Sequence, residues 1–223
     1  RRVGRSIVFG LLLAAALAPG APAREVPFAA PAGLGAQYSG VVDAELVDLD
    51  ADGDRDLVGM ADVGGAGAAQ VFYFERDRSA AALDFDAYEI FNVFGNLTAT
   101  DVGDLDRDGY TDLIVAYTSA DDVLHLDWGE NDGTPASGAW SFHRIYSDSG
   151  GILVEAIWAD DTVAGDFDGD GDLDVALAYG SEETLGDPDG RILVFVNDGS
   201  PAGVDWASYV VKDWSEFVRW FNL

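Results

Sequence analysis

The sequence predicts an all-β protein made of β-propeller blades, each blade being a sheet of four antiparallel strands. Three Asp-rich loops of one pattern recur at a blade-like interval, since they begin at residues 48, 104 and 166. A similar set of short apolar runs follows each loop, and no stretch after the N-terminal region has a long helical period. Four short strands repeated about every 60 residues are typical of a propeller blade.

The three loops share the pattern Asp-x-Asp-x-Asp-Gly-x-x-Asp and align without gaps over residues 48–56, 104–112 and 166–174. A single loop of this pattern could be only a turn, because Asp and Gly are good turn formers. Three copies in register, each flanked by apolar residues, favour a repeated structural and chemical role instead. We therefore treat the loop as the defining unit of the repeat.

Apolar runs around each loop are expected to form the strands of one blade. Short runs of this kind, bounded by turn residues, are typical of buried strands. A strand is expected directly after each loop, a further strand after a turn, and a fourth strand before the next unit. In the three units these strands fall near 57–58, 71–74 and 88–93; 113–116, 123–126 and 142–146; and 175–178, 192–196 and 209–211. Turns are expected at 64–65 and 120–121, with a longer polar excursion over 180–190.

The N-terminal region has the features of an export signal. Arg1, Arg2 and Arg5 precede an apolar run over 7–17 and a small-residue cleavage site at 21–23. A membrane anchor is the weaker alternative, because the run is about half of the roughly 20 residues that a spanning helix needs. We therefore expect a cleaved signal peptide, a secreted or cell-surface protein, and no membrane insertion after cleavage.

The expected organisation follows from the signal and the repeat. Residues 1–23 are assigned to the signal peptide, 24–35 to a linker and 36–223 to the propeller segment. Three blades are expected, with the start of a fourth at the C-terminal end, because a fourth loop would begin near residue 222. Three blades cannot close a ring, so the chain is expected to be a fragment of a longer, seven-bladed propeller. The expected blades cover 36–95, 96–155 and 156–214, with the fourth starting over 215–223.

Composition excludes several classes of partner. The chain has 41 acidic and 12 basic side chains and a formal net charge of -29. Nucleic acids and anionic membrane surfaces are therefore not expected as partners. No cysteine is present, which removes disulfides and thiolate metal sites. A metal ion, if bound, must be held by oxygen or histidine.

The loop pattern matches the chemistry of calcium, which takes about 6 to 8 hard oxygen ligands. Asp at positions 1, 3 and 5 turns three carboxylates toward one centre, and Gly at position 6 permits the sharp turn. Position 7 can offer its backbone carbonyl, and position 9 adds a carboxylate. An EF-hand would need Glu at position 12 and flanking helices, which are absent from the pattern. Magnesium prefers to keep its waters and zinc prefers His or Cys, so calcium is favoured.

One ion is expected per loop, about three in all. The expected ligands are Asp48, Asp50, Asp52, Asp54 and Asp56; Asp104, Asp106, Asp108, Tyr110 and Asp112; and Asp166, Asp168, Asp170, Asp172 and Asp174. Because crowded carboxylates repel one another without a cation, metal binding is expected to be coupled to folding.

Residues 103–113 and 165–175 resemble FG-GAP or VCBS repeats, the units of integrin alpha-chain-like propellers. Phe94-Gly95 matches the Phe-Gly half of the name, whereas the Gly-Ala-Pro half is absent at 59–61, 116–118 and 178–180. This departure points to the bacterial VCBS-like branch. The resemblance covers roughly 36–223 and implies calcium on the loops and an extracellular setting, without fixing a ligand.

Other residues that could carry chemistry have plainer interpretations. His125 and His143 lie in alternating apolar strands and are expected to be strand-face histidines. Asp160-Asp161 and Glu182-Glu183 could be paired glycosidase acids, but solvated loop charge is favoured. The Trp side chains could stack on sugars, although packing between blades is favoured. No catalytic residue and no organic cofactor is assigned.

Three functions are consistent with the sequence. The leading one is a non-catalytic, calcium-binding extracellular scaffold whose loops opposite the calcium sites present a surface to a protein or glycan, for example in adhesion. The alternative is the propeller portion of a secreted polysaccharide lyase or glycoside hydrolase. A purely structural repeat in a large surface adhesin is the third. An added domain with a convergent acid/base pair would favour the enzyme.

Overall fold

The computed structural model describes residues 40–62, 68–76, 85–137, 139–149, 154–183, 188–203 and 206–213. Apart from one 3-10 turn, every regular element in the described residues is a β-strand, which confirms the all-β prediction. The strands are β1 (Gly40–Val47), β2 (Asp56–Asp62), β3 (Ala68–Arg76), β4 (Phe85–Gly103), β5 (Asp112–Ser119), β6 (Leu124–Glu130), β7 (Ser141–Asp148), β8 (Val154–Gly165), β9 (Asp174–Glu183), β10 (Pro188–Val196) and β11 (Ala207–Asp213), and the 3-10 turn is η1 (Pro135–Ser137). No helix among these residues is long and apolar enough to cross a membrane.

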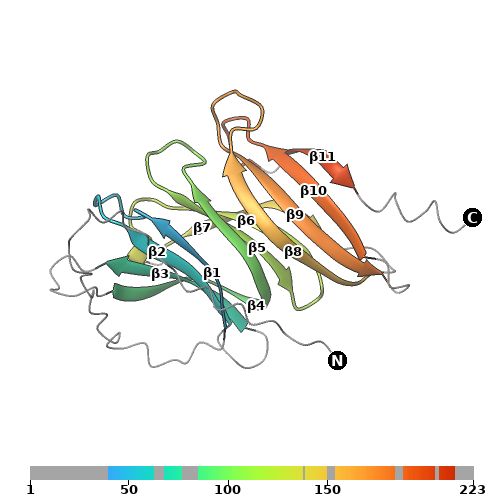
Figure 1. Ribbon diagram of the computed structural model, residues 1–223. Helices are drawn as coiled ribbons and strands as arrows, with labels where there is room; N and C mark the ends of the chain where they lie inside the picture. Colours follow the sequence, from blue (N-terminus) through green and yellow to red (C-terminus); the bar gives the residue numbers. More distant parts are fainter. Residues whose placement is uncertain are drawn as a thin grey trace, which may run out of the picture.

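The strands form three consecutive units of four antiparallel strands. Strand β4 serves two of them, because residues 85–94 pair with β3 and residues 95–103 pair with β5. Blade 1 is β1, β2, β3 and residues 85–94; blade 2 is residues 95–103, β5, β6 and β7; and blade 3 is β8, β9, β10 and β11. Figure 1 shows the three units side by side in chain order, which is consistent with neighbouring blades of a propeller.

The change of blade within β4 takes place at Gly95. Its φ is 156°, and a Cβ built on it would lie 2.0 Å from the carbonyl oxygen of Thr118 in β5. No side chain can occupy that space, so the strand can pass from one sheet to the next only with glycine here. The Phe-Gly pair of the sequence thus marks the junction between blades 1 and 2.

Replacing Gly95 with alanine is expected to destabilise the protein by roughly 3 kcal/mol or more, because the new methyl group collides with rigid backbone. Gly59→Ala is the matched control, since its Cβ would meet only the Phe74 ring at 3.4 Å and the Asp43 carbonyl oxygen at 3.7 Å. Urea unfolding measures both variants. Equal, small losses in the two would show that the junction tolerates a side chain.

The core lies between blades, and the sheet of blade 2 buries both of its faces. Successive residues of β5 point to opposite sides. Leu113 and Val115 pack in a cluster with blade 1, whereas Ile114 and Ala116 pack in a second cluster with blade 3. Burial on both faces explains why β5 reads as a continuous apolar run rather than an alternating one.

Aromatic side chains fill the spaces between neighbouring blades, as expected from the sequence. Trp128 is fully buried in the cluster between blades 2 and 3, and Trp206 packs against it. Trp140 packs against the cluster between blades 1 and 2. Both histidines lie on strands: His143 stacks on Trp128, with ring centroids 4.7 Å apart, and His125 lies beside Tyr117 at 5.0 Å.

One expectation about the turns is corrected. Residues 180–182 and 188–190 are paired strand rather than part of a long polar excursion, because β9 and β10 stay paired up to Glu182 and Pro188. Polar residues and glycine can extend a hairpin as well as form a loop, so composition alone did not distinguish the two. The turn at 120–121 is confirmed by the hydrogen bond from Asp122 N to Ser119 O at 3.0 Å. The expected turn at 64–65, the signal peptide, the linker and the start of a fourth blade lie outside the described residues.

Candidate metal centre

Each Asp-rich loop joins the first strand of a blade to the second. Loop 1 (residues 48–56) connects β1 to β2, loop 2 (104–112) connects β4 to β5, and loop 3 (166–174) connects β8 to β9. Because the three blades run in the same direction, the loops lie along one edge of the molecule, as Figure 1 shows. The repeat therefore produces three similar sites at one end of the sheets.

The backbone of the loops turns twice through the left-handed region. Gly at position 6 has a positive φ in every loop, as its predicted role in a sharp turn requires. Position 4 is also left-handed, which the sequence did not reveal, because only loop 3 has glycine there. The φ values are 58°, 62° and 85° for Ala51, Arg107 and Gly169, and 89°, 96° and 95° for Gly53, Gly109 and Gly171.

Carboxylates hold this backbone through a repeated set of hydrogen bonds. The position-1 carboxylate accepts the N–H of the position-6 glycine, at 3.0 Å, 3.2 Å and 3.1 Å in loops 1, 2 and 3. The position-3 carboxylate accepts the N–H of position 5 at 3.1 Å, 3.1 Å and 3.0 Å. The position-5 carboxylate accepts the N–H of position 7 at 3.0 Å, 2.8 Å and 2.8 Å. These turns direct several acidic side chains toward the inside of each loop.

The position-9 aspartate is buried in every loop and accepts two backbone N–H groups. In loop 2, Asp112 Oδ2 accepts from Leu105 N and Oδ1 accepts from Asn131 N, both at 2.9 Å. In loop 3, Asp174 does the same with Phe167 N at 2.8 Å and Asn197 N at 2.9 Å. The carboxylate thus connects the start of the loop to the end of the third strand of its blade.

In loop 1, Asp56 has the equivalent partners and one more. Its Oδ2 accepts from Leu49 N at 3.4 Å and from the Tyr73 hydroxyl at 3.3 Å, and its Oδ1 accepts from Arg76 N at 2.9 Å. The sequence predicted a metal-ligand role for position 9. The structure adds a second role, which is to hold the loop in place. Asp56 is the one buried aspartate of the five in loop 1, and its burial explains this role.

In loops 1 and 2, burial and neighbouring acidic side chains make the ionised form of several aspartates less favourable. Desolvation raises the pKa of Asp112 to about 7, despite the hydrogen bonds from Asn131 and Leu105 that favour its ionised form. Desolvation also raises the pKa of Asp56 and of Asp106, and neighbouring aspartates raise both further. A bound cation would offset these unfavourable charges.

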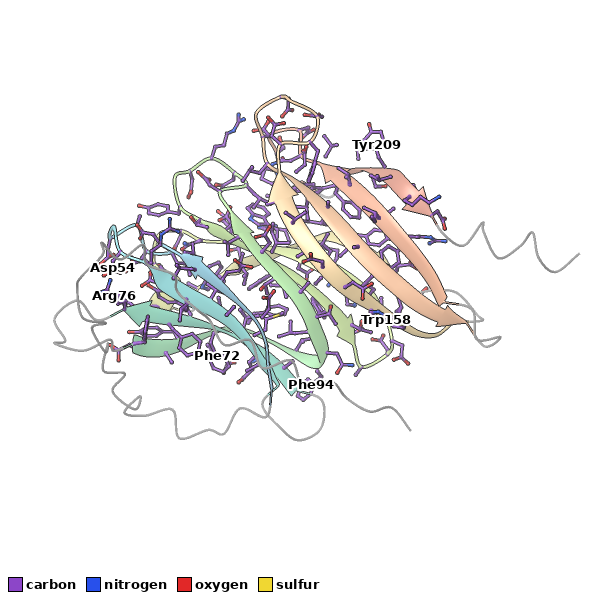
Figure 2. All side chains as sticks on the ribbon, viewed as in Figure 1. Asp54, Phe72, Arg76, Phe94, Trp158 and Tyr209 are labelled. Atoms are coloured by element: carbon purple, nitrogen blue, oxygen red, sulfur yellow. The ribbon has the colours of Figure 1, made fainter. Side chains whose placement is uncertain are left out.

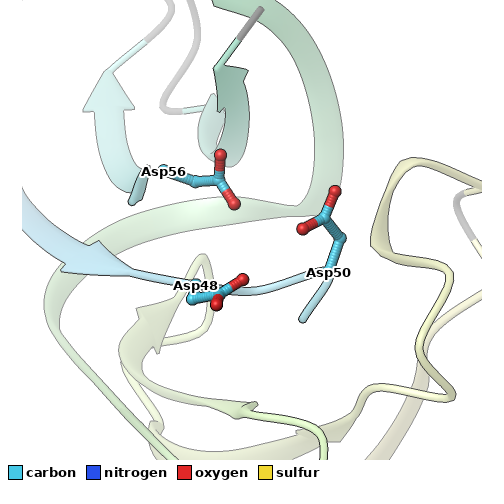
Figure 3. Close-up of side chains that lie close together, drawn as sticks. All are labelled: Asp48, Asp50 and Asp56. Carbon is cyan, nitrogen blue, oxygen red and sulfur yellow. The ribbon is translucent and has the colours of Figure 1, made fainter. Parts of the chain in front are cut away.

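Three carboxylates converge in each loop, with one oxygen of each lying within 4.8 Å of the others. Figure 3 shows the group in loop 1, where the side chains of Asp48, Asp50 and Asp56 point toward a common space. The groups are Asp48, Asp50 and Asp56; Asp104, Asp106 and Asp108; and Asp166, Asp168 and Asp174. The carboxylates of Asp52, Asp112 and Asp170 lie outside these closest groups. The backbone carbonyls expected from Asp54, Tyr110 and Asp172 stay a prediction.

The donor set fits calcium. Two ligand oxygens on opposite sides of a calcium ion are roughly 5 Å apart, twice the Ca–O distance, and the 4.8 Å limit of each group falls within this span. The Oδ1 atoms of Asp48 and Asp104 are buried and have no hydrogen-bond partner. A buried carboxylate oxygen without a partner is costly, so a hard cation at that place would satisfy it.

The fold and the loops together define a repeat protein of propeller type. Residues 104–177 match the family of the FG-GAP-like repeat. The matched segment begins at the first aspartate of loop 2, contains loop 3 and ends within β9. The match supports an FG-GAP repeat protein, as the loop sequences suggested. No curated protein matches the chain.

Proposed function

We propose that this chain is a calcium-binding, non-catalytic β-propeller scaffold of the VCBS-like branch of FG-GAP repeat proteins. It acts outside the cell and presents a surface to a protein or glycan ligand. The observation that carries the calcium proposal is the threefold recurrence of one loop geometry with three converging carboxylates. The signal-like N-terminal sequence supports export.

Within each loop, the three converging carboxylates would hold the ion, and the carbonyl of position 7 remains a further proposed ligand. The buried Oδ1 atoms of Asp48 and Asp104 are the oxygens best prepared for this role. When bound, calcium supplies positive charge that draws together side chains which otherwise repel. The loop residues provide the shape, because their backbone is fixed by the repeated hydrogen bonds at positions 1, 3 and 5.

Calcium titration by calorimetry tests the proposal. About three ions are expected per chain, one per loop, and Asp104→Ala combined with Asp106→Ala should remove one of them while leaving the protein folded. Asp86→Ala, an exposed aspartate of β4, is the matched control and should leave the number unchanged. A folded protein that binds no calcium would show that the aspartates serve only as turn residues.

A further inference from the structure

Loop 1 is held by a residue of the next blade. In the chain, the backbone of Leu49 lies between two of the converging aspartates, Asp48 and Asp50. Its N–H donates to Asp56 within the same loop. Its carbonyl oxygen accepts from Nδ2 of Asn131, at the end of β6 in blade 2, at 2.8 Å. The side chain of Asn131 therefore fixes the segment that carries two proposed ligands.

Asn131 also belongs to the frame of loop 2. Its Nδ2 donates to the carbonyl of Thr111 at 2.9 Å, its Oδ1 accepts from Gly133 N at 3.1 Å, and its backbone N–H donates to Asp112. The residue is buried. One asparagine thus connects the loops of two neighbouring blades.

Loop 2 has the same arrangement with blade 3. Nδ2 of Asn197 donates to the carbonyl of Leu105 at 2.9 Å and to that of Leu173 at 3.2 Å. Leu105 is the position-2 residue of loop 2, as Leu49 is in loop 1. Both side chains are covered by the following blade, with exposed fractions of 1% and 0%.

Loop 3 differs at this position. Phe167 is 50% exposed, and among the described residues no asparagine side chain reaches its carbonyl. At the outer strand of the same blade, Tyr209 points away from the sheet and is 60% exposed (Figure 2). In the described part of the chain, no following blade covers loop 3.

The proposed ligands of loop 3 differ accordingly. Both oxygens of Asp166 accept backbone N–H groups, from Gly169 at 2.7 Å and from Gly171 at 3.1 Å. The corresponding Oδ1 atoms in loops 1 and 2 are buried without a partner. In addition, the guanidinium of Arg107 lies 2.8 Å from Asp172 of loop 3 and places a positive charge beside that loop.

We propose that Asn131 and Asn197 are positioning residues for the cation loops of the preceding blades, loops 1 and 2. This inference rests on the proposed function, since it assigns positioning residues to the calcium sites. Outer residues that orient metal ligands commonly change metal affinity by about 10- to 100-fold.

Calorimetric titration of the full chain with calcium chloride tests the inference. Tight calcium sites are expected in loops 1 and 2. Asn131→Ala should weaken one tight site at least tenfold, whereas Asn92→Ala, an exposed asparagine of β4, should weaken none. In an Asp48→Ala background, which removes the loop 1 site, Asn131→Ala should have little further effect on the remaining tight site.

Asn131→Asp separates positioning from a general loss of structure. The change keeps the shape and the acceptor for Gly133, and its added negative charge alone would strengthen calcium binding. Weaker binding in this variant therefore supports the role of the lost N–H donors. Calcium affinities unchanged by both Asn131 variants overturn the inference while leaving the proposed function intact. Absence of calcium binding in all loops overturns both.

Discussion

Removing calcium is expected to lower the melting temperature of this protein by more than about 10 °C. A site that is occupied at a thousandfold excess over its Kd stabilises the folded state by about 4 kcal/mol. In a domain of this size each kcal/mol shifts the melting temperature by roughly 2 to 4 °C. Two occupied sites are enough to produce the expected change in melting temperature. Only the folded loops bring the repelling carboxylates together, so a bound cation stabilises the folded state.

Thermal unfolding followed by circular dichroism, in calcium chloride and in chelator, measures this effect. Magnesium chloride at the same concentration is the control, since it screens the net charge of -29 equally without fitting the loops. Equal stabilisation by the two salts would mean that charge screening, rather than a specific site, supports the fold.

Asp112→Ala is expected to destabilise the metal-free protein by about 3 kcal/mol. The substitution leaves the buried N–H groups of Leu105 and Asn131 without an acceptor, and each unpaired group costs about 1 to 3 kcal/mol. Burial of the Asp112 carboxylate is unfavourable and raises its pKa to about 7. Removing this buried charge therefore offsets part of the loss. Urea unfolding in chelator measures the change.

Asp86→Ala serves as the control for Asp112→Ala, because Asp86 is exposed on β4 and its loss should change stability by less than about 0.5 kcal/mol. A loss of the same small size for Asp112→Ala would contradict the role given to position 9 in holding the loop. The result bears on the fold alone, since calcium is absent from both measurements.

The sequence was sufficient to predict the blades because their signals are local. Apolar runs after each loop identified the strands, and Gly53, Gly109 and Gly171 identified the turns, since a left-handed turn strongly favours glycine. The convergence of acids could also be predicted, because position 1 and position 3 carry aspartate in all three loops. Each of these features depends on neighbours in the chain.

Features that depend on distant contacts could not be predicted in the same way. Asn131 forms its most informative hydrogen bond with Leu49 of another blade. Ala51 and Arg107 adopt a left-handed conformation that their residue types do not predict. The continuity of β4 through two blades depends on the contact of Gly95 with β5. A weak signal was present for the asparagines, since Asn-Asp-Gly recurs at 131–133 and 197–199, once in each of the last two units.

The central claim is that the Asp-rich loops are calcium sites. Anomalous diffraction from crystals grown in calcium, recorded at a wavelength where calcium scatters anomalously, tests it most directly. If the loops are calcium sites, a peak is expected about 2.3 to 2.6 Å from the carboxylate oxygens of Asp48 and Asp50, and a second at this distance from those of Asp104 and Asp106. Well-ordered loops of the same shape without any anomalous peak would contradict it.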